Sequence, residues 1–471
     1  MRKILIYAFI IVAGFASCSK DDNSGESGVD FVVAFESPST GFDTDETSKN
    51  INLTFSTPAT SDGSIVISFT AQNAVYGEDF TTTPSASDSK ITLPIASGMG
   101  QTSFEFKKLQ NPSEGEEAVI TFEITSVNHP DGYTQGNTST VVSLTDTASL
   151  GGQFNPEVGG HNQPNQVYVD LSAQKETAIR RDSWDLSFYG GDSFRVGING
   201  SVYMATAQLN TTDINTVNES QVEELMGLVA VGTFDPSNMN YIDHPGGDIN
   251  QTAISPISEN DNDNKVYLVN LGYEVSTDTP EPGSVAIAGD HRGWKKIRIL
   301  RSGNDYLLQY ANLNDTSYQT AIISKNPEYN FTFFSFTNNT VNVEPIKEKW
   351  DLNFTVFTNE IEGYGSYGYA DFVAANRKAG VTGYMVEGNT EAFNNFTSSQ
   401  IQPNLFEIDQ RFIGSNWRVG GGPNTQPGIK DNVFFIIKDP DENIYKLRFT
   451  ALLNENGIRG YPAFEYVLLN E

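Results

Sequence analysis

Short apolar runs separated by turn-forming residues dominate the sequence. Runs of four to eight residues rich in Val, Ile, Thr, Phe and Tyr, such as INLTFS, IVISFTA, VYLVNLGY and FFIIK, are bounded by clusters of Gly, Asn, Asp and Pro. Such runs are typical of strands, because β-branched and aromatic side chains pack well on a pleated surface. At 471 residues the chain is too long for one hydrophobic core. The sequence therefore predicts a mainly antiparallel, all-β protein of several domains.

Helix signals are few and short. Ser220 and Glu223 have the spacing of a capping box ahead of VEELMGLVA. Two further patches, 372–379 and 389–397, have helical composition. We therefore expect helices only as short connections between strands.

The first 18 residues have the pattern of a signal peptide. Arg2 and Lys3 precede ILIYAFIIVAGFAS, an apolar run shorter than the roughly 20 residues that span a bilayer. The only cysteine, Cys18, follows this run directly. Its position resembles a bacterial lipobox, in which the cysteine is acylated and becomes the mature N-terminus. The alternative is an ordinary signal peptide with an incidental cysteine. We predict that residues 1–18 are a lipoprotein signal peptide and that Cys18 carries the lipid.

Residues 19–29, SKDDNSGESGV, are polar, small and acidic, so they cannot bury enough apolar surface to become ordered. They are predicted to form a disordered tether. Their start, SKDD, resembles the export signal of surface-exposed lipoproteins of the Bacteroidota. No other stretch of the sequence is apolar for long enough to span a membrane, so lipid would supply the membrane contact. The expected location is the outer membrane, on the cell surface.

The formal net charge of −30 argues against nucleic acid or anionic lipid as a partner. Binding to phosphate groups requires clustered Lys and Arg, which compensate the negative charge of the backbone. Acidity at this level mainly favours solubility.

Residues 30–147 have the strand spacing of a β-sandwich. A Gly-Glu-Asp-Phe phrase at 77–80, the strand candidate ITLPIA and a Glu-Gly-Glu-Glu phrase occur in the order of Calx-beta domains, which this region resembles. The resemblance implies a sandwich that, in some Calx-beta domains, binds calcium between loops at one end. The matching carboxylates would be Glu36, Asp79 and Glu117. Other Calx-beta domains bind no calcium and act as spacers, so both roles stay open.

One phrase occurs twice, as SWDLSF at 183–188 and as KWDLNF at 349–354, in a chain with four tryptophans. Each copy is followed by a strand, a polar turn and a second strand, KKIRILRSGNDYLLQYANLN in the first case and NVFFIIKDPDENIYKLRFTALL in the second. Separated phrases that recur in the same order indicate an internal repeat, although chance similarity is the alternative. We predict two tandem copies, 152–328 and 329–471. The Trp, Leu and Phe of each phrase are expected on one side of a strand.

The second copy, from FTFFSFTNNTVNVEPIKEKWDLNFTVF (331–357) to the closing segment 432–469, resembles the start and end of an HmuY-family domain. The phrase VYVDLSAQKETAIRRDSWDLSF (167–188) resembles the family's opening as well. The resemblance implies a surface lipoprotein with an all-β fold. The best-known members hold haem through two axial side chains, both His or both Met, and pass it to an outer-membrane receptor. Such a protein is a carrier and not an enzyme.

Axial ligands of this kind are scarce here. The second copy has no histidine and one methionine, Met385. The first copy has His291 just ahead of its final hairpin, with His244 and Met239 in its middle region. A His291–His244 or His291–Met239 pair is therefore available by residue type. Alternatively, His291 is a solvated loop residue and His244 belongs to a turn. These three residues are the candidate haem ligands.

Known enzyme motifs do not occur in the sequence, which has no Gly-rich phosphate loop, no Gly-x-Ser-x-Gly elbow and no His-Glu-x-x-His helix. The leading hypothesis is a lipid-anchored surface protein that captures haem or another tetrapyrrole. The alternative is a structural or adhesive surface lipoprotein without haem activity. It would contact protein or glycan through aromatic loops such as YGSYGYADF (364–372), because tyrosine offers a wide contact area with a polar tip.

Overall fold

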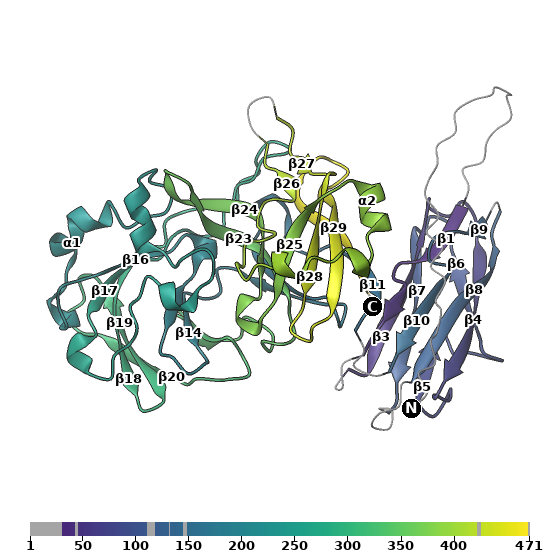
Figure 1. Cartoon of the computed structure of the whole chain (residues 1–471), viewed down its shortest axis with the longest axis horizontal. Helices are drawn as coiled ribbons and strands as arrows, with labels where there is room; N and C mark the ends of the chain where they lie inside the picture. Colours follow the sequence, from purple (N-terminus) through teal and green to yellow (C-terminus); the bar gives the residue numbers. More distant parts are fainter. Residues whose placement is uncertain are drawn as a thin grey trace. The chain divides into compact units, whose positions relative to one another are not determined.

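The computed structural model describes residues 31–42, 46–110, 118–130, 132–144, 148–421 and 425–469. The chain divides into two compact units (Figure 1). Unit 1 comprises Met1–Gln153 with Ser172–Gln174, and unit 2 comprises Phe154–Leu171 with Lys175–Glu471. Both are built mainly of antiparallel strands, which confirms the predicted all-β class. The predicted signal peptide and tether lie outside the described residues.

Unit 1 is a β-sandwich. Its described residues form two five-stranded sheets of order β5-β7-β3-β1-β9 and β2-β10-β8-β4-β6. Alternating burial along β6 shows why these sequences form strands, because Ile91, Leu93 and Ile95 face the core while their neighbours are exposed. The two sheets share one apolar core, in which the rings of Phe104 and Phe122 lie 4.9 Å apart. The strands are β1 (Phe31–Phe35), β2 (Ser39–Thr40), β3 (Ser48–Phe55), β4 (Gly63–Gln72), β5 (Phe80–Thr83), β6 (Lys90–Ile95), β7 (Gln101–Lys108), β8 (Val119–Asn128), β9 (Gly132–Thr134) and β10 (Ser139–Ser143).

Unit 2 contains sheets of order β13-β12-β23-β24, β15-β14-β21-β22 and β16-β17-β18-β19-β20, together with the run β30-β29-β28-β25 and the short pair β26-β27. Its earlier strands are β12 (Asn165–Asp170), β13 (Lys175–Arg180), β14 (Leu186–Tyr189), β15 (Val196–Ile198), β16 (Ala205–Gln208), β17 (Val266–Asn270), β18 (Trp294–Ser302), β19 (Asp305–Asn312) and β20 (Gln319–Ile323). Its later strands are β21 (Phe331–Ser335), β22 (Asn339–Val341), β23 (Leu352–Ile361), β24 (Gly365–Ala375), β25 (Thr382–Glu387), β26 (Arg418–Val419), β27 (Gly428–Ile429), β28 (Val433–Lys438), β29 (Ile444–Leu453) and β30 (Arg459–Leu468). β11 (Gly151–Phe154) crosses the boundary between the units.

Strands of the two predicted copies pair with each other. β12, from the first copy, pairs with β23 of the second, and β21, from the second copy, pairs with β14 of the first. The predicted boundary between the copies, at 328/329, therefore lies within one compact unit, and two sheets of that unit contain strands from both copies. Behind these pairs lie two apolar cores, one containing Leu186 and Phe188 and the other Leu352 and Phe354.

The helices are short connections, as expected, but two of the helix predictions were wrong in detail. α1 (Glu219–Met226) is capped by Asn218 and Gln221, two residues before the predicted capping box, because the Gln221 side chain reaches back to the main-chain N–H of Asn218 at 3.1 Å. The patch 372–379 is the end of β24 and a 3₁₀ turn, since its apolar residues pair with β23.

The patch 389–397 contains α2 (Thr390–Asn395), which confirms that prediction. The 3₁₀ turns are η1 (Gly160–Asn162), η2 (Gly200–Val202), η3 (Ile214–Thr216), η4 (Pro236–Tyr241), η5 (Ile249–Gln251), η6 (Asp261–Asp263), η7 (Arg377–Ala379), η8 (Ser398–Gln400) and η9 (Pro403–Leu405).

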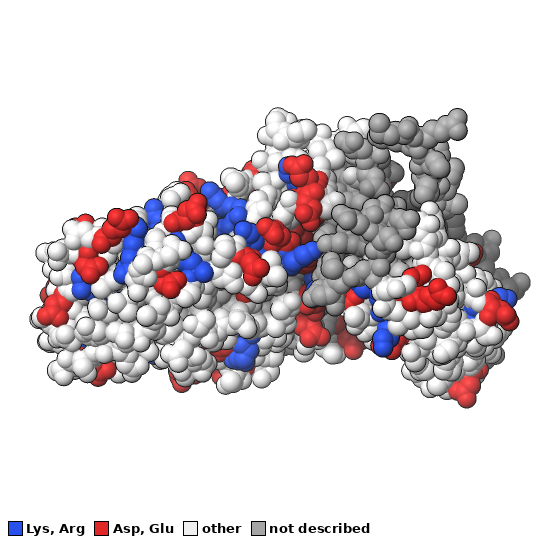
Figure 2. Space-filling view, turned by 90° about the horizontal axis from the view of Figure 1, so that it is seen from below, with Lys and Arg blue, Asp and Glu red and all other residues white. Residues whose placement is uncertain are grey.

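Acidic and basic side chains lie interspersed on the face of the molecule shown in Figure 2. A surface on which both signs of charge are mixed favours solubility. Among the described residues, no helix has the length and apolar character needed to cross a membrane.

Candidate functional site

The two Trp-Asp phrases occupy matching surroundings in unit 2. The ring of Trp350 packs edge-on against Tyr168 of β12, with centroids 4.9 Å apart, and Trp184 packs edge-on against Phe333 of β21 at 4.8 Å. Each tryptophan thus contacts the first strand of the other copy. All four rings belong to one aromatic cluster. The prediction that Trp, Leu and Phe share one face was wrong, because each strand begins after the Asp and the Trp packs into this separate cluster.

The aspartates of the phrases make equivalent hydrogen bonds. Asp185 Oδ2 accepts a hydrogen bond from the main-chain N–H of Phe336, and Asp351 Oδ2 accepts one from that of Leu171, both at 2.8 Å. The pairing register is also equivalent, because Ser187 lies opposite Phe333 just as Asn353 lies opposite Tyr168. Each aspartate therefore fixes the end of the strand that comes from the other copy.

Two asparagines close the same arrangement. Asn199 Nδ2 donates to the carbonyl of Trp184 at 2.8 Å, and Asn376 Nδ2 donates to that of Trp350 at 2.9 Å. Each asparagine is also the N-cap of a 3₁₀ turn, η2 after Asn199 and η7 after Asn376. The two turns therefore hold corresponding positions relative to the two tryptophans.

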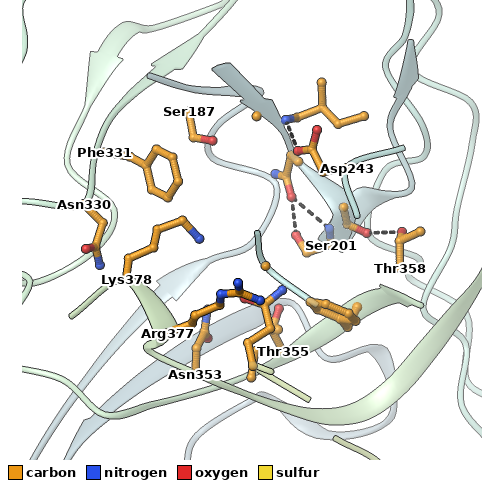
Figure 3. A pocket seen from close by; sticks show the side chains of 18 of the residues that line it. Ser187, Ser201, Asp243, Asn330, Phe331, Asn353, Thr355, Thr358, Arg377 and Lys378 are labelled. Atoms are coloured by element: carbon orange, nitrogen blue, oxygen red, sulfur yellow. Dashed lines mark hydrogen bonds between the residues drawn. The ribbon is translucent and has the colours of Figure 1, made fainter. Parts of the chain in front are cut away.

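A cavity of about 210 Å³ lies among these elements. Six Phe, Tyr and Trp residues line it, one of which is Phe357. The other five share one hydrophobic cluster and are here called the aromatic wall: Tyr168, Trp184, Phe331, Phe333 and Trp350. Its polar lining includes Ser187, Ser201, Asp243, Asn330, Glu344, Asn353, Thr355, Thr358, Arg377 and Lys378, most of which are labelled in Figure 3. The turns η2 and η7 both contribute to the lining. The cavity therefore lies between the two predicted copies.

The Lys378 ammonium is the central charge of this cavity. Figure 3 shows its side chain extending into the hollow, across from Asp243 and Ser201. The nitrogen lies 5.0 Å from the centre of the Phe331 ring. Within the described part of the chain, this ammonium makes no hydrogen bond and no ion pair. Burial lowers the pKa of Lys378, and the neighbouring Glu344 and Asp243 act to raise it.

The two carboxyl groups beside Lys378 are held by the protein itself. Glu344 accepts a hydrogen bond from the Phe331 main-chain N–H at 2.7 Å, and burial raises its pKa to about 7. Asp243 accepts hydrogen bonds from the main-chain N–H groups of Ile198 and Ala253, both at 2.8 Å, and burial raises its pKa to about 6. Burial penalises the charged form of each acid.

Three buried polar atoms of the cavity lining have no partner within the described chain. They are the indole nitrogens of Trp184 and Trp350 and the side-chain oxygen of Asn353. Buried polar groups in folded proteins are nearly always hydrogen-bonded to protein or water. Such atoms beside a cavity are candidates for hydrogen bonds to water or to a ligand.

The candidate haem ligands do not meet at this cavity. His244 lines it, is exposed and accepts a hydrogen bond at Nδ1 from the Gly246 N–H at 3.1 Å. His291 has Nδ1 3.2 Å from the Gly293 N–H and Nε2 2.8 Å from Asn270 Oδ1, so both ring nitrogens are engaged. Met239 packs in the apolar cluster of α1. The cavity thus does not fit a haem held by two of these side chains.

The calcium candidates of unit 1 are also separated. Glu36 accepts a hydrogen bond from Asn52, which lies opposite Ser103 on β7. Asp79 accepts the main-chain N–H of Leu109 at its carbonyl, beyond the other end of that strand. Six residues of strand span about 20 Å. Glu36 and Asp79 therefore do not lie together.

Two further predicted residues, Cys18 and Glu117, lie outside the described residues. In the described ranges there is no cluster of three or more His, Cys, Asp or Glu side chains placed to hold a metal ion.

Sequence reasoning missed Lys378, Glu344 and Asp243. None of them belongs to a motif, and they approach one another only through the pairing of strands that are distant in sequence. The asparagine and 3₁₀ turn that follow each Trp-Asp phrase are a signal in principle. Asn199 and Asn376 follow the phrases at different distances, however, so the sequence does not align them.

Solved structures show weak similarity to parts of the chain. The apo form of the Calx CBD1 domain is 11% identical and covers 24% of this chain and 96% of its own, with a TM-score of 0.21. A candidate lipoprotein from Bacteroides fragilis is 13% identical and covers 39% of this chain and 95% of its own, with a TM-score of 0.17. A candidate carbohydrate binding protein from Bacteroides ovatus is 11% identical and covers 61% and 72%, with a TM-score of 0.16.

No curated protein matches this chain. The profile of one family, described as HmuY protein, matches residues 162–466, which comprise nearly all of unit 2. The match includes both Trp-Asp phrases and every residue of the cavity lining. Because it spans well over half of the sequence, the chain belongs to the HmuY family.

Proposed function

We propose that this protein is a cell-surface lipoprotein, anchored through Cys18, whose HmuY-family unit binds a small ligand and performs no catalysis. The observation that carries the proposal is the cavity between the two Trp-Asp phrases, with an unpaired ammonium and three unpartnered polar atoms in its lining. Ligand sites of proteins are concave, mostly apolar and furnished with a few polar groups, and this cavity has that composition.

We also infer that unit 2 consists of two copies of one β unit that exchange their first strands. Three pairs of residues make matching contacts in the two copies, which supports this inference. The pairs are Trp184 and Trp350, Asp185 and Asp351, and Asn199 and Asn376. Chance similarity of two strand patterns would not reproduce the same ring contacts, carboxylate bonds and caps together. A ligand between the copies would then lie where two similar surfaces meet.

The test is a thermal-shift screen of the purified protein with small neutral, acidic and basic compounds. Ala374 lines the cavity, and Ala374→Leu would fill part of it. Ala370 lies on the same strand, is also buried and is outside the lining, so Ala370→Leu is the matched control. We expect bound compounds to raise the melting temperature and to change tryptophan fluorescence in the wild type and the control only. Failure of every compound, or binding that persists in Ala374→Leu, would contradict the proposal.

Haem capture is the second candidate, supported by membership of the HmuY family and by the exposed position of His244. Because only His244 of the three predicted ligands lines the cavity, haem held by two of them would bind at the surface and not inside the cavity. A hemin titration measures this directly through a shifted, saturable Soret band. A response no larger than that of the His244→Ala, His291→Ala double variant would remove axial ligation by these residues, and with it transfer of haem to an outer-membrane receptor.

Adhesion is supported by a separate observation. Tyr364 and Tyr367 are 58% and 41% exposed, and the ring of Tyr367 lies 5.8 Å from that of Phe234, which is 61% exposed. The segment 365–372 belongs to β24, so the predicted loop was wrong there. Tyr367 stands on this strand, which pairs with β23, and Tyr364 lies in the turn between the two strands. A glycan array comparing the wild type with Tyr367→Ala tests this reading. If neither protein binds any glycan on the array, glycan contact is excluded.

A further inference from the structure

We propose that the cavity of unit 2 is selective for a small carboxylate, whose anionic group binds Lys378 and whose apolar part lies on the aromatic wall. The inference rests on the proposed function, namely that this cavity holds a ligand. It follows from the unused hydrogen-bond donors of the lining, from the residues that differ between the two copies and from the volume of the cavity.

Several hydrogen-bond donors of the lining residues are unused. The Lys378 ammonium carries three donors and the indoles of Trp184 and Trp350 one each, and none of these has a partner within the described chain. On the acceptor side, the side-chain oxygen of Asn353 is unpartnered. A ligand that satisfies the ammonium and the indole donors must present acceptor oxygens.

The carboxyl groups near Lys378 do not supply a hydrogen-bond acceptor to its ammonium. Asp243 has both oxygens engaged by main-chain N–H groups, and Glu344 accepts from the Phe331 N–H. Neither acid lies within ion-pair distance of the ammonium. Lys378 is therefore balanced at a distance and remains available for a direct charge-assisted bond, which is the stronger kind of hydrogen bond.

The copies differ where they face the cavity. Lys378 is the second residue of η7, and the second residue of η2 is Ser201, whose hydroxyl donates to Asn199 Oδ1 at 2.6 Å. Phe331, which lies under the Lys378 ammonium, corresponds by register to Gln166 in the other copy. The cavity lining therefore carries an ammonium at η7 and a hydroxyl at the corresponding position of η2, which suits a ligand with its charge at one end.

The volume restricts the size of the ligand. Pockets for drug-sized molecules measure about 300–1,000 Å³, and this cavity has about 210 Å³. A monocarboxylate with a six-membered ring or a short alkyl chain is of suitable size. The aromatic wall supplies flat apolar contact for such a body.

The test uses acids paired with their amides, which keep the shape and remove the charge: benzoate with benzamide, phenylacetate with phenylacetamide, and hexanoate with hexanamide. Isothermal titration calorimetry on the purified protein at pH 6, where the raised pKa of Glu344 keeps that neighbouring acid mostly neutral, measures each dissociation constant. We expect at least one acid to bind about tenfold or more tightly than its amide, equivalent to about 1.4 kcal/mol. Lys378→Met should reduce this ratio to about one, and Lys378→Arg should largely restore it.

Lys265→Met is the control, since Lys265 lies on a surface turn and donates to the Asn262 carbonyl. Thermal melting of each variant checks that unit 2 is folded. The inference is overturned if no acid binds, if acids and amides bind equally, or if the preference survives Lys378→Met. Equal binding of acids and amides that is lost in Ala374→Leu would overturn the carboxylate inference alone. If no compound of either test binds, the proposed function fails with it.

Discussion

Replacing Glu344 by glutamine should stabilise unit 2 at pH 8 and leave it almost unchanged at pH 4.5. The side chain is 8% exposed, and burial raises its pKa from 4.5 to about 7. The folded state therefore favours the protonated acid, and its contribution to stability is complete below pH 4.5 and is lost as the pH rises through 7. At 1.36 kcal/mol for each pKa unit, the loss is at most about 3 kcal/mol. Glutamine stays neutral and keeps an oxygen that can accept the Phe331 N–H.

The assay is urea unfolding followed by tryptophan fluorescence. The four tryptophans, Trp184, Trp294, Trp350 and Trp417, all belong to unit 2, so the signal reports this unit alone. The free energy of unfolding is compared between variant and wild type from pH 4.5 to pH 8, and their difference should grow with pH. Glu348→Gln is the control, since that side chain is 60% exposed. A pH-independent difference, or a variant less stable than wild type at pH 8, would show that the charge of Glu344 is stabilised by Lys378 and refute the reasoning.

Three further predictions use the same assay. Arg292→Met should destabilise unit 2 by about 3–5 kcal/mol, because it leaves the buried carboxylate of Asp185 without its ion-pair partner at 2.7 Å; Asp351→Asn should instead stabilise it at pH 8, since burial and nearby acids raise the pKa of Asp351. Unchanged stability of the arginine variant would contradict this reading of the pair. Asn199→Ala and Asn376→Ala should each cost about 1–3 kcal/mol by leaving main-chain carbonyls unpaired, and a cost confined to one copy would argue against equivalent caps.

The sequence predicted which segments form strands better than it predicted which strands pair with one another. Alternating runs such as KITLPI and VFFIIK carry their own strand signal, because burial on one face of a strand is a local pattern. The exchange of β12 and β21 has no such signal, since both choices of partner place apolar residues against apolar residues. The repeated phrase marked the positions of the two tryptophans, but the prediction of the side of the strand on which their rings lie was wrong. What decided that direction was the aspartate that follows each of them. Its carboxylate binds the main chain at the end of a strand that is 151 positions away for Asp185 and 180 positions away for Asp351.

The same distinction explains why the site was invisible beforehand. Residues that match between the copies, such as Asp185 and Asp351, have structural roles. Because the same role occurs in both copies, the same residues recur in the sequence. Residues that differ, such as Ser201 and Lys378, face the cavity, and a difference leaves no pattern to recognise. A packing defect between two copies would be expected to fill with apolar side chains or to collapse, because a half-buried ammonium without a direct partner costs free energy. The chain instead keeps Lys378 where the other copy has a serine. Glu344 and Asp243 balance this cation only at a distance, and a direct hydrogen-bond partner is what the described chain does not supply, which is the reason to look for an anionic ligand.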